Sequence, residues 1–204
     1  MSTLTLYTHP ESRGVVARWM LEETGQSYRT EYLEYGTTMK APEYLAINPM
    51  GKVPAIRHDT TVVTENAAIC AYLADAFPAA GLAPPSGSRE RGDYYRWLFF
   101  VAGPLEAAVL AKLGGATLEP RSAGFGSLED VLATLDALVS SREFVAGDRF
   151  SAADLMLSAY LGWYMQFGVI DKRPAFEAYA ARHAGREAAV RARATEAERA
   201  AAKA

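Results

Sequence analysis

The sequence predicts an α/β N-terminal domain with the element order βαβαββα, followed by an all-α C-terminal domain. Alternating apolar runs and runs with helical spacing interleave as far as residue 77. Residues 79–88 (AAGLAPPSGS) are rich in proline, glycine and serine, as linkers are. After them, apolar residues recur only at helical spacing. We therefore expect domains at residues 1–78 and 89–204, with 79–88 as the linker.

The first βαβ unit is indicated by two alternating segments around a helical one. Residues 3–7 alternate as a strand, and Pro10-Glu11-Ser12 interrupts the chain before a helix that Gly25 ends as a C-cap. Residues 28–35 alternate again. The helical crossover between these strands predicts that they are parallel.

A hairpin and a helix complete the predicted N-terminal domain. Residues 36–47 are expected to form a loop with one short helix. The strands at 55–58 and 62–64 flank a turn, and the helix at 65–77 stops at Pro78.

The C-terminal domain is predicted to be a set of helices. Ser151 and Asp154 have the spacing of a capping box at the start of one of them. The loop at residues 114–126 is glycine-rich and expected to be mobile. The stretch after Glu187 is rich in alanine, glutamate and arginine, and because it offers little apolar surface we expect it to fray. The predicted helices cover residues 94–109, 128–139, 152 onward, 174–184 and 187 onward.

Charge and composition exclude several classes of partner. The chain carries 21 basic and 24 acidic residues, for a net charge of −3, and they are interspersed. This gives no footprint for nucleic acid or an anionic membrane surface. No segment resembles a signal peptide or a membrane span, so a cytoplasmic protein is expected.

Cysteine and histidine content argues against redox chemistry at a cysteine of the chain and against a metal site. Cys70 is the single cysteine and lies in an apolar helical run, so we interpret it as a buried small hydrophobe. His9, His58 and His183 lack metal-ligand spacing, and no metal is expected.

The most informative stretch is Asn48-Pro49-Met50-Gly51-Lys52-Val53-Pro54, followed by Thr64-Glu65-Asn66. A turn at Val53-Pro54 before a strand leaves the backbone of Val53 open to an extended ligand. Glu65 and Asn66 begin a helix, so a carboxylate lies beside free backbone amides. Such a corner suits the zwitterion of a small peptide, whereas either half alone would be an ordinary turn or capped helix.

These motifs, in this order, resemble those of the glutathione transferases. Leu6-Tyr7 leading into Pro10-Glu11-Ser12-Arg13, Tyr72-Leu73 ending at Phe77-Pro78, and Phe150-Ser151-Ala152-Ala153-Asp154 complete the likeness, which spans nearly the whole chain. The resemblance implies a thioredoxin-like N-terminal domain, a cis bond before Pro54, glutathione as co-substrate and a homodimer. Asn66 departs from the serine usual at its position, which leaves glutathione affinity open.

The resemblance also implies which residues form the site. Glutathione would lie along Lys52, Val53, Pro54, Glu65 and Asn66. Ser12 occupies the region where serine-type members stabilise the thiolate, although a helix N-cap is the competing role. Tyr7 is the second choice because its position resembles that of the tyrosine-type hydroxyl. The candidates for a pocket that holds a small apolar electrophile are Phe100, Pro104, Trp163 and Phe167.

Three functions remain open at this point. The first is conjugation of glutathione to a small hydrophobic electrophile. The second is other glutathione chemistry, namely disulfide or peroxide reduction or isomerisation. The third is a non-catalytic protein that binds glutathione or serves as a scaffold.

Overall fold

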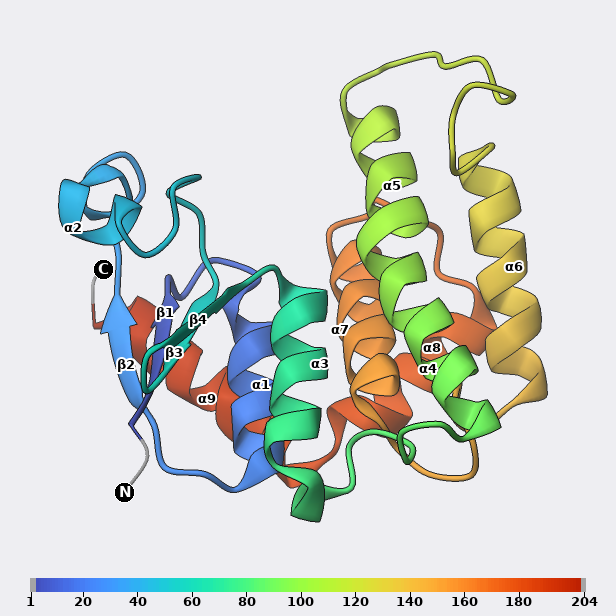
Figure 1. Ribbon diagram of the computed structural model, residues 1–204. Helices are drawn as coiled ribbons and strands as arrows, with labels where there is room; N and C mark the ends of the chain where they lie inside the picture. The colour runs from blue at the N-terminus through green and yellow to red at the C-terminus, as the bar shows by residue number, and fades with distance from the viewer. Residues whose placement is uncertain (1–2, 203–204) are drawn as a thin grey trace. The chain divides into compact units, whose positions relative to one another are not determined.

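A computed structural model describes residues 3–202, which divide into two compact units (Figure 1). Of the described residues, one unit contains 3–82 and 186–202, and the other contains Ala83–Gly185. The predicted boundaries at residues 78 and 88 remain predictions. Among the described residues, no helix has both the length and the apolar character needed to cross a membrane.

The N-terminal unit has a thioredoxin-like arrangement built on a mixed sheet, as predicted. Its strands are β1 (Leu4–Thr8), β2 (Arg29–Tyr32), β3 (Ala55–His58) and β4 (Thr61–Thr64), in the order β2-β1-β3-β4. Strand β2 is parallel to β1, and β3 is antiparallel to both of its neighbours. The second strand is shorter than the alternation at residues 28–35 predicted.

Helices cover both faces of this sheet (Figure 1). The strand β1 and the helices α1 (Gly14–Thr24) and α3 (Asn66–Ala76) pack together around buried leucines and isoleucines such as Leu6 and Ile69. On the other face, Tyr7 contacts a cluster supplied by η1 (Thr38–Lys40) and α2 (Pro42–Leu45). A short η2 (Pro78–Ala80) follows α3.

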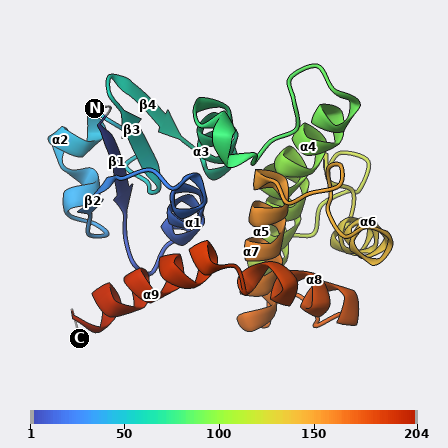
Figure 2. The same cartoon turned by 90° about the horizontal axis from the view of Figure 1, so that it is seen from below.

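The C-terminal stretch forms a docked helix, and the prediction that it would fray is wrong. Helix α9 (Glu187–Ala201) lies along α1 (Figure 2). Its apolar contact surface consists of alanines, of which Ala189 and Ala192 are completely buried. Such small side chains contribute little apolar area, but they allow close approach, so that Arg18 of α1 reaches Glu196 of α9 at 2.7 Å.

The second unit is helical. Its elements are α4 (Arg89–Phe100), η3 (Val101–Leu105), α5 (Glu106–Leu113), α6 (Leu128–Ser141), α7 (Ala152–Gln166) and α8 (Pro174–Ala184). The predicted single helix at 94–109 contains the π-helical turn η3, which includes Pro104. Because proline has no N–H to donate, the regular hydrogen-bond ladder cannot continue through this residue.

The predicted capping box begins α7. The backbone N–H and the hydroxyl of Ser151 both donate to Asp154 Oδ2, at 2.9 and 2.8 Å. Val145 N–H and the hydroxyl of Tyr179 donate to Asp154 Oδ1. The fully buried carboxylate thereby connects α7, α8 and the loop before α7.

Candidate functional site

The strand register brings the predicted glutathione-site segments to one end of the strands of the N-terminal sheet. Tyr7 of β1 is opposite Ala55 of β3, and Ala55 is opposite Thr64 of β4. At this end of the sheet, Val53-Pro54 leads into β3, β4 leads into Glu65, and β1 leads into the loop that carries Ser12. Asn66 Nδ2 donates to the carbonyl of Arg13 at 3.3 Å, which ties the start of α3 to the start of α1.

Two side-chain hydrogen bonds to the carbonyl of Lys52 fix the segment that precedes β3. The carbonyl of Lys52 accepts from the hydroxyl of Tyr44 at 2.6 Å and from Asn48 Nδ2 at 2.8 Å. Burial raises the pKa of Tyr44 to about 12, so its hydroxyl keeps the proton that it donates. Gly51 has φ 57°, and a Cβ there would lie 2.5 Å from the carbonyl oxygen of Met39, so the turn requires glycine.

The Val53-Pro54 bond is cis, as the resemblance implies. Among the described residues, neither the amide nor the carbonyl of Val53 is engaged in a hydrogen bond. Ala55 is the first residue of β3, so this open backbone precedes the paired part of the strand. An extended ligand could therefore pair with Val53 as an additional strand does.

Glu65 adopts a backbone conformation that is rare for a residue with a side chain. It has φ 65° and ψ 123°, occupies the N-cap position of α3, and its side chain makes no capping hydrogen bond. The side chain is exposed, and no carboxylate contact joins it to the other described residues. Strained conformations of this kind concentrate at ligand-binding sites. The first amides of α3, which carry partial positive charge, thus lie beside the negative carboxylate of Glu65.

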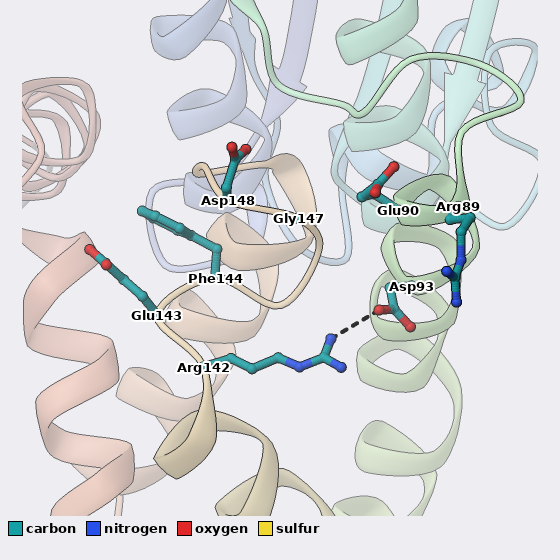
Figure 3. A pocket seen from close by; sticks show the side chains of 8 residues that line it. All are labelled: Arg89, Glu90, Asp93, Arg142, Glu143, Phe144, Gly147 and Asp148. Atoms are coloured by element: carbon teal, nitrogen blue, oxygen red, sulfur yellow. Dashed lines mark hydrogen bonds and ion pairs between the residues drawn. The ribbon is translucent and has the colours of Figure 1, made fainter.

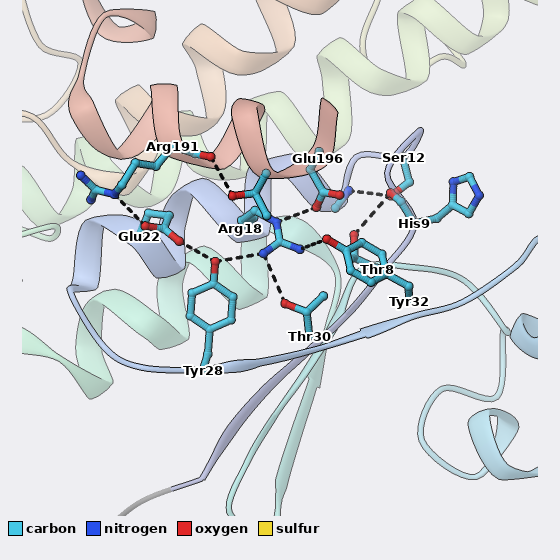
Figure 4. A network of polar contacts seen from close by, with 12 residues as sticks. Thr8, His9, Ser12, Arg18, Glu22, Tyr28, Thr30, Tyr32, Arg191 and Glu196 are labelled. Atoms are coloured by element: carbon cyan, nitrogen blue, oxygen red, sulfur yellow. Dashed lines mark hydrogen bonds and ion pairs between the residues drawn. The ribbon is translucent and has the colours of Figure 1, made fainter. Parts of the chain in front are cut away.

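Ser12 is buried in the loop between β1 and α1 (Figure 4). Its hydroxyl donates to the carbonyl of His9 at 2.6 Å and accepts from the N–H of Gly14, the first residue of α1, at 3.0 Å. The N-cap residue of α1 is Arg13 rather than Ser12, although the Ser12 hydroxyl accepts from the first helical amide. The hydroxyl can also serve a ligand, but only by turning its proton away from His9.

Tyr7 occupies a packing position. It is 6% exposed, and its ring lies 5.6 Å from that of Tyr44 and 5.9 Å from the guanidinium of Arg57. Lys52 and Glu65 are exposed, whereas Arg13 is half-buried. Cys70 is completely buried, and burial raises the pKa of its thiol to about 12, so this thiol is unreactive as interpreted.

The predicted acceptor-pocket residues lie on α4, on η3, on α7 and, for Phe167, directly after α7 in the helical unit. Phe100 pairs with Trp97 at a centroid distance of 5.4 Å, and Trp163 pairs with Phe167 at 5.8 Å. Pro104, Phe100 and Trp163 are partly exposed, and Phe167 is 64% exposed. Aromatic surface is thus accessible on this unit.

The helical unit also contains a polar cavity of about 660 Å³ that includes none of these residues (Figure 3). Arg142 pairs across it with Asp93 at 2.9 Å. The lining is mostly charged, which suits a small apolar electrophile poorly. It consists of Arg89, Glu90, Asp93, Arg142, Glu143, Phe144, Gly147 and Asp148.

The sequence analysis did not predict a buried polar network around Arg18, which joins α1 to β2 and α9 (Figure 4). The guanidinium of Arg18, 2% exposed, donates to Glu196, Tyr28, Thr30 and Tyr32. Its signal in the sequence was an arginine within the apolar run of the first helix. The network fixes α1, whose N-terminus carries the Ser12 loop.

Among residues 3–202, no group of three or more histidine, cysteine, aspartate or glutamate side chains is arranged to hold a metal ion.

Two family models match the chain. Residues 2–75 match the glutathione S-transferase N-terminal domain, and residues 99–182 match the C-terminal domain. Glutathione S-transferase GST-4.5 of Xanthomonas campestris pv. campestris is 33% identical over 174 residues, which cover 81% of this chain and 85% of that protein. Glutathione S-transferase GstA of Escherichia coli O157:H7 is 27% identical, covering 78% and 82%.

Solved structures show the same fold. The chain is similar to a glutathione transferase from Methylococcus capsulatus str. Bath with a TM-score of 0.81 and 30% identity, covering 96% of this chain and 99% of that one. It is similar to a sphingomonad glutathione S-transferase complexed with glutathione with a TM-score of 0.79 and 33% identity, covering 95% and 98%.

Proposed function

Because the chain belongs to the glutathione S-transferase family and is a glutathione-dependent transferase, we propose where it binds glutathione and how it activates the sulfur. The peptide backbone of glutathione pairs with Val53, next to Pro54. The Glu65 carboxylate takes the γ-glutamyl ammonium, the amides at the start of α3 with Asn66 take the adjacent carboxylate, and Lys52 takes the glycine carboxylate. The open backbone of Val53 beside the strained Glu65 is the observation that carries this proposal.

We assign the activation of the sulfur to Ser12. Its hydroxyl exchanges the hydrogen bond to the His9 carbonyl for one to the thiolate, while Gly14 N–H continues to donate to Oγ. A neutral hydrogen bond contributes about 1 kcal/mol and one to a charged group about 1.5 to 3, so the exchange favours the thiolate by about 0.5 to 2 kcal/mol. The N-terminus of α1 adds about 0.3 to 1 kcal/mol.

Together these terms lower a thiol pKa near ~8.5 to roughly 6.5 to 8. A useful fraction of bound glutathione is then thiolate at neutral pH. The thiolate forms the new C–S bond on the electrophile, and the leaving group departs with the electron pair of the bond that breaks. Tyr7 is the weaker candidate because its ring packs against Tyr44 on the other face of the sheet.

The acceptor is proposed to be a small apolar electrophile held by Phe100, Pro104, Trp163 and Phe167. We further propose a cytoplasmic homodimer in which the exposed aromatic residues of α4 contribute to the contact between copies. Tyr95 and Phe99 stack at 6.2 Å and are 38% and 56% exposed, which supports such a surface.

Calorimetric titration with glutathione tests the binding site. Glu65→Ala should weaken binding by about 1.5 to 3 kcal/mol, or one to two decades of Kd, because the ammonium loses its charged partner. Glu43→Ala is the matched control, since it removes an exposed glutamate from α2. Equal affinity of the parent and Glu65→Ala, or no binding heat for the parent, contradicts the proposal.

A substrate panel decides between the reactions. Conjugation predicts turnover of aryl halides or epoxides. Turnover restricted to mixed disulfides or peroxides indicates the reductive alternative, and binding of glutathione with no turnover indicates the non-catalytic one.

A further inference from the structure

Both the backbone and the side chain of His9 accept hydrogen bonds within the loop between β1 and α1. The carbonyl of His9 accepts from the Ser12 hydroxyl at 2.6 Å, and its imidazole Nδ1 accepts from the N–H of Glu11 at 3.1 Å. His9 is 6% exposed. One residue therefore contacts both the amide and the hydroxyl that define the shape of this turn.

The orientation of the imidazole is itself fixed. Because Glu11 N–H donates to Nδ1, the proton of the neutral ring is on Nε2, which lies 3.6 Å from Glu34 Oε2. The ring of Tyr35 lies 4.5 Å from that of His9, and the Tyr35 hydroxyl donates to the carbonyl of Glu11 at 3.3 Å. The segment after β2 thus orients His9, and His9 orients the loop.

Gly14, the first residue of α1, packs closely against Thr8 and against Ser12 of the loop. A Cβ on Gly14 would clash with Thr8 Oγ1 and lie 2.9 Å from Ser12 Oγ. Glu11 N–H donates to His9 Nδ1, and without this hydrogen bond we expect the turn to loosen. Ser12 would then lose the position set by Gly14 N–H.

We propose that His9 is the positioning residue of the Ser12 loop, acting through the hydrogen bond from Glu11 N–H to its Nδ1. This inference rests on the proposed role of Ser12 in activating the glutathione sulfur. His9 itself does not touch the sulfur; it fixes the hydroxyl that does.

Asparagine and glutamine at position 9 test the hydrogen bond directly. In His9→Asn the amide oxygen is as many bonds from the backbone as Nδ1, so the acceptor for Glu11 N–H is kept. In His9→Gln the oxygen lies one bond further out, and the acceptor is misplaced. His9→Phe removes the acceptor but keeps a ring against Tyr35.

The readouts are the thiolate absorbance titration of bound glutathione, kcat with one electrophile, and the Kd of S-methylglutathione, which has no thiol. His9→Gln and His9→Phe should lower kcat by about 3- to 10-fold and raise the pKa of the bound thiol by about 0.5 to 1. His9→Asn should retain most of the parent's rate. The Kd of S-methylglutathione should be the same in all, since Val53 and Glu65 are unchanged.

His58→Phe is a matched control, because this histidine makes a comparable hydrogen bond, 2.8 Å to the Tyr72 hydroxyl, and pairs with Leu4 at the other end of β1. Equal activity of His9→Asn and His9→Gln overturns the inference, even if His9→Phe fails to fold. An unchanged thiol pKa in both His9→Gln and His9→Phe overturns it as well.

Ser12→Ala, measured in parallel, distinguishes a failure of the proposed role of Ser12 from a failure of the proposed role of His9. If Ser12→Ala leaves the thiol pKa unchanged, the proposed role of Ser12 has failed. If Ser12→Ala raises it while His9→Gln does not, only the inference about His9 has failed.

Discussion

Replacement of Glu196 by alanine should weaken the docking of α9 against α1 and destabilise the chain. Glu196 is 4% exposed, and its Oε1 accepts from Arg18 Nε at 2.7 Å. Burial alone would lower the pKa of Arg18, but the hydrogen bond and charge of Glu196 outweigh it and raise that pKa. The variant therefore leaves a guanidinium buried without its counter-charge.

Removing one partner of a buried ion pair costs about 3 to 5 kcal/mol. Arg18 retains Tyr28, Thr30 and Tyr32 as acceptors, which favours the lower end, about 3 kcal/mol. For a chain of this length that corresponds to a decrease in Tm of roughly 6 to 12 °C.

Urea denaturation followed by far-ultraviolet circular dichroism measures this loss. Glu187→Ala is the control, since that carboxylate is 96% exposed and 3.8 Å from Arg191, and it should change stability by less than about 0.5 kcal/mol. The double variant Arg18→Leu with Glu196→Leu should be more stable than Glu196→Ala, because no charge is left buried. A loss below about 1 kcal/mol for Glu196→Ala would refute the reasoning.

Further predictions concern pH, backbone packing and assembly. Burial works against ionisation of Glu22, but hydrogen bonds from Tyr28 and Arg191 and the charges of Arg191 and Arg18 lower its pKa. Its stabilising effect is therefore complete above the pKa of the unfolded chain, about 4.3, and is lost as the pH falls below it; the stability gap between parent and Glu22→Gln should close between about pH 5 and 3. A gap independent of pH would contradict this. Gly14→Ala should destabilise the chain by about 1 to 3 kcal/mol because its Cβ meets Thr8 and Ser12, and a variant as stable as the parent in urea would show that the turn adapts. Light scattering at micromolar concentration should give twice the 22.1 kDa mass of one chain, and a mass of one chain that persists on concentration would exclude the homodimer.

Local patterns predicted most of the helices and strands, because turn and cap residues mark where many of them begin or end. Gly25 is left-handed at the end of α1, and Ser151 with Asp154 forms the expected box at the start of α7. Docking of α9 could not be predicted from apolar periodicity. Alanines and arginine–glutamate pairs such as Arg186 with Glu23 hold it, and the pairing depends on which helix lies opposite.

The sequence indicated which segments the sheet brings together, but not the hydrogen bonds that their residues make. The motifs around Val53 and Glu65 identified a corner, and the register of Tyr7, Ala55 and Thr64 explains why it forms. The state of the Ser12 hydroxyl was not predictable, because it depends on the direction of the His9 carbonyl in a turn.

Thiolate absorbance titration of bound glutathione in the parent, Ser12→Ala and Tyr7→Phe tests the central claim most directly. We expect Ser12→Ala to raise the pKa of the bound thiol by about 0.4 to 1.5, the equivalent of the hydrogen-bond exchange, and to lower conjugation in proportion. Tyr7→Phe should leave that pKa unchanged. A thiol pKa that responds to Tyr7→Phe and not to Ser12→Ala would contradict the assignment of the activating hydroxyl.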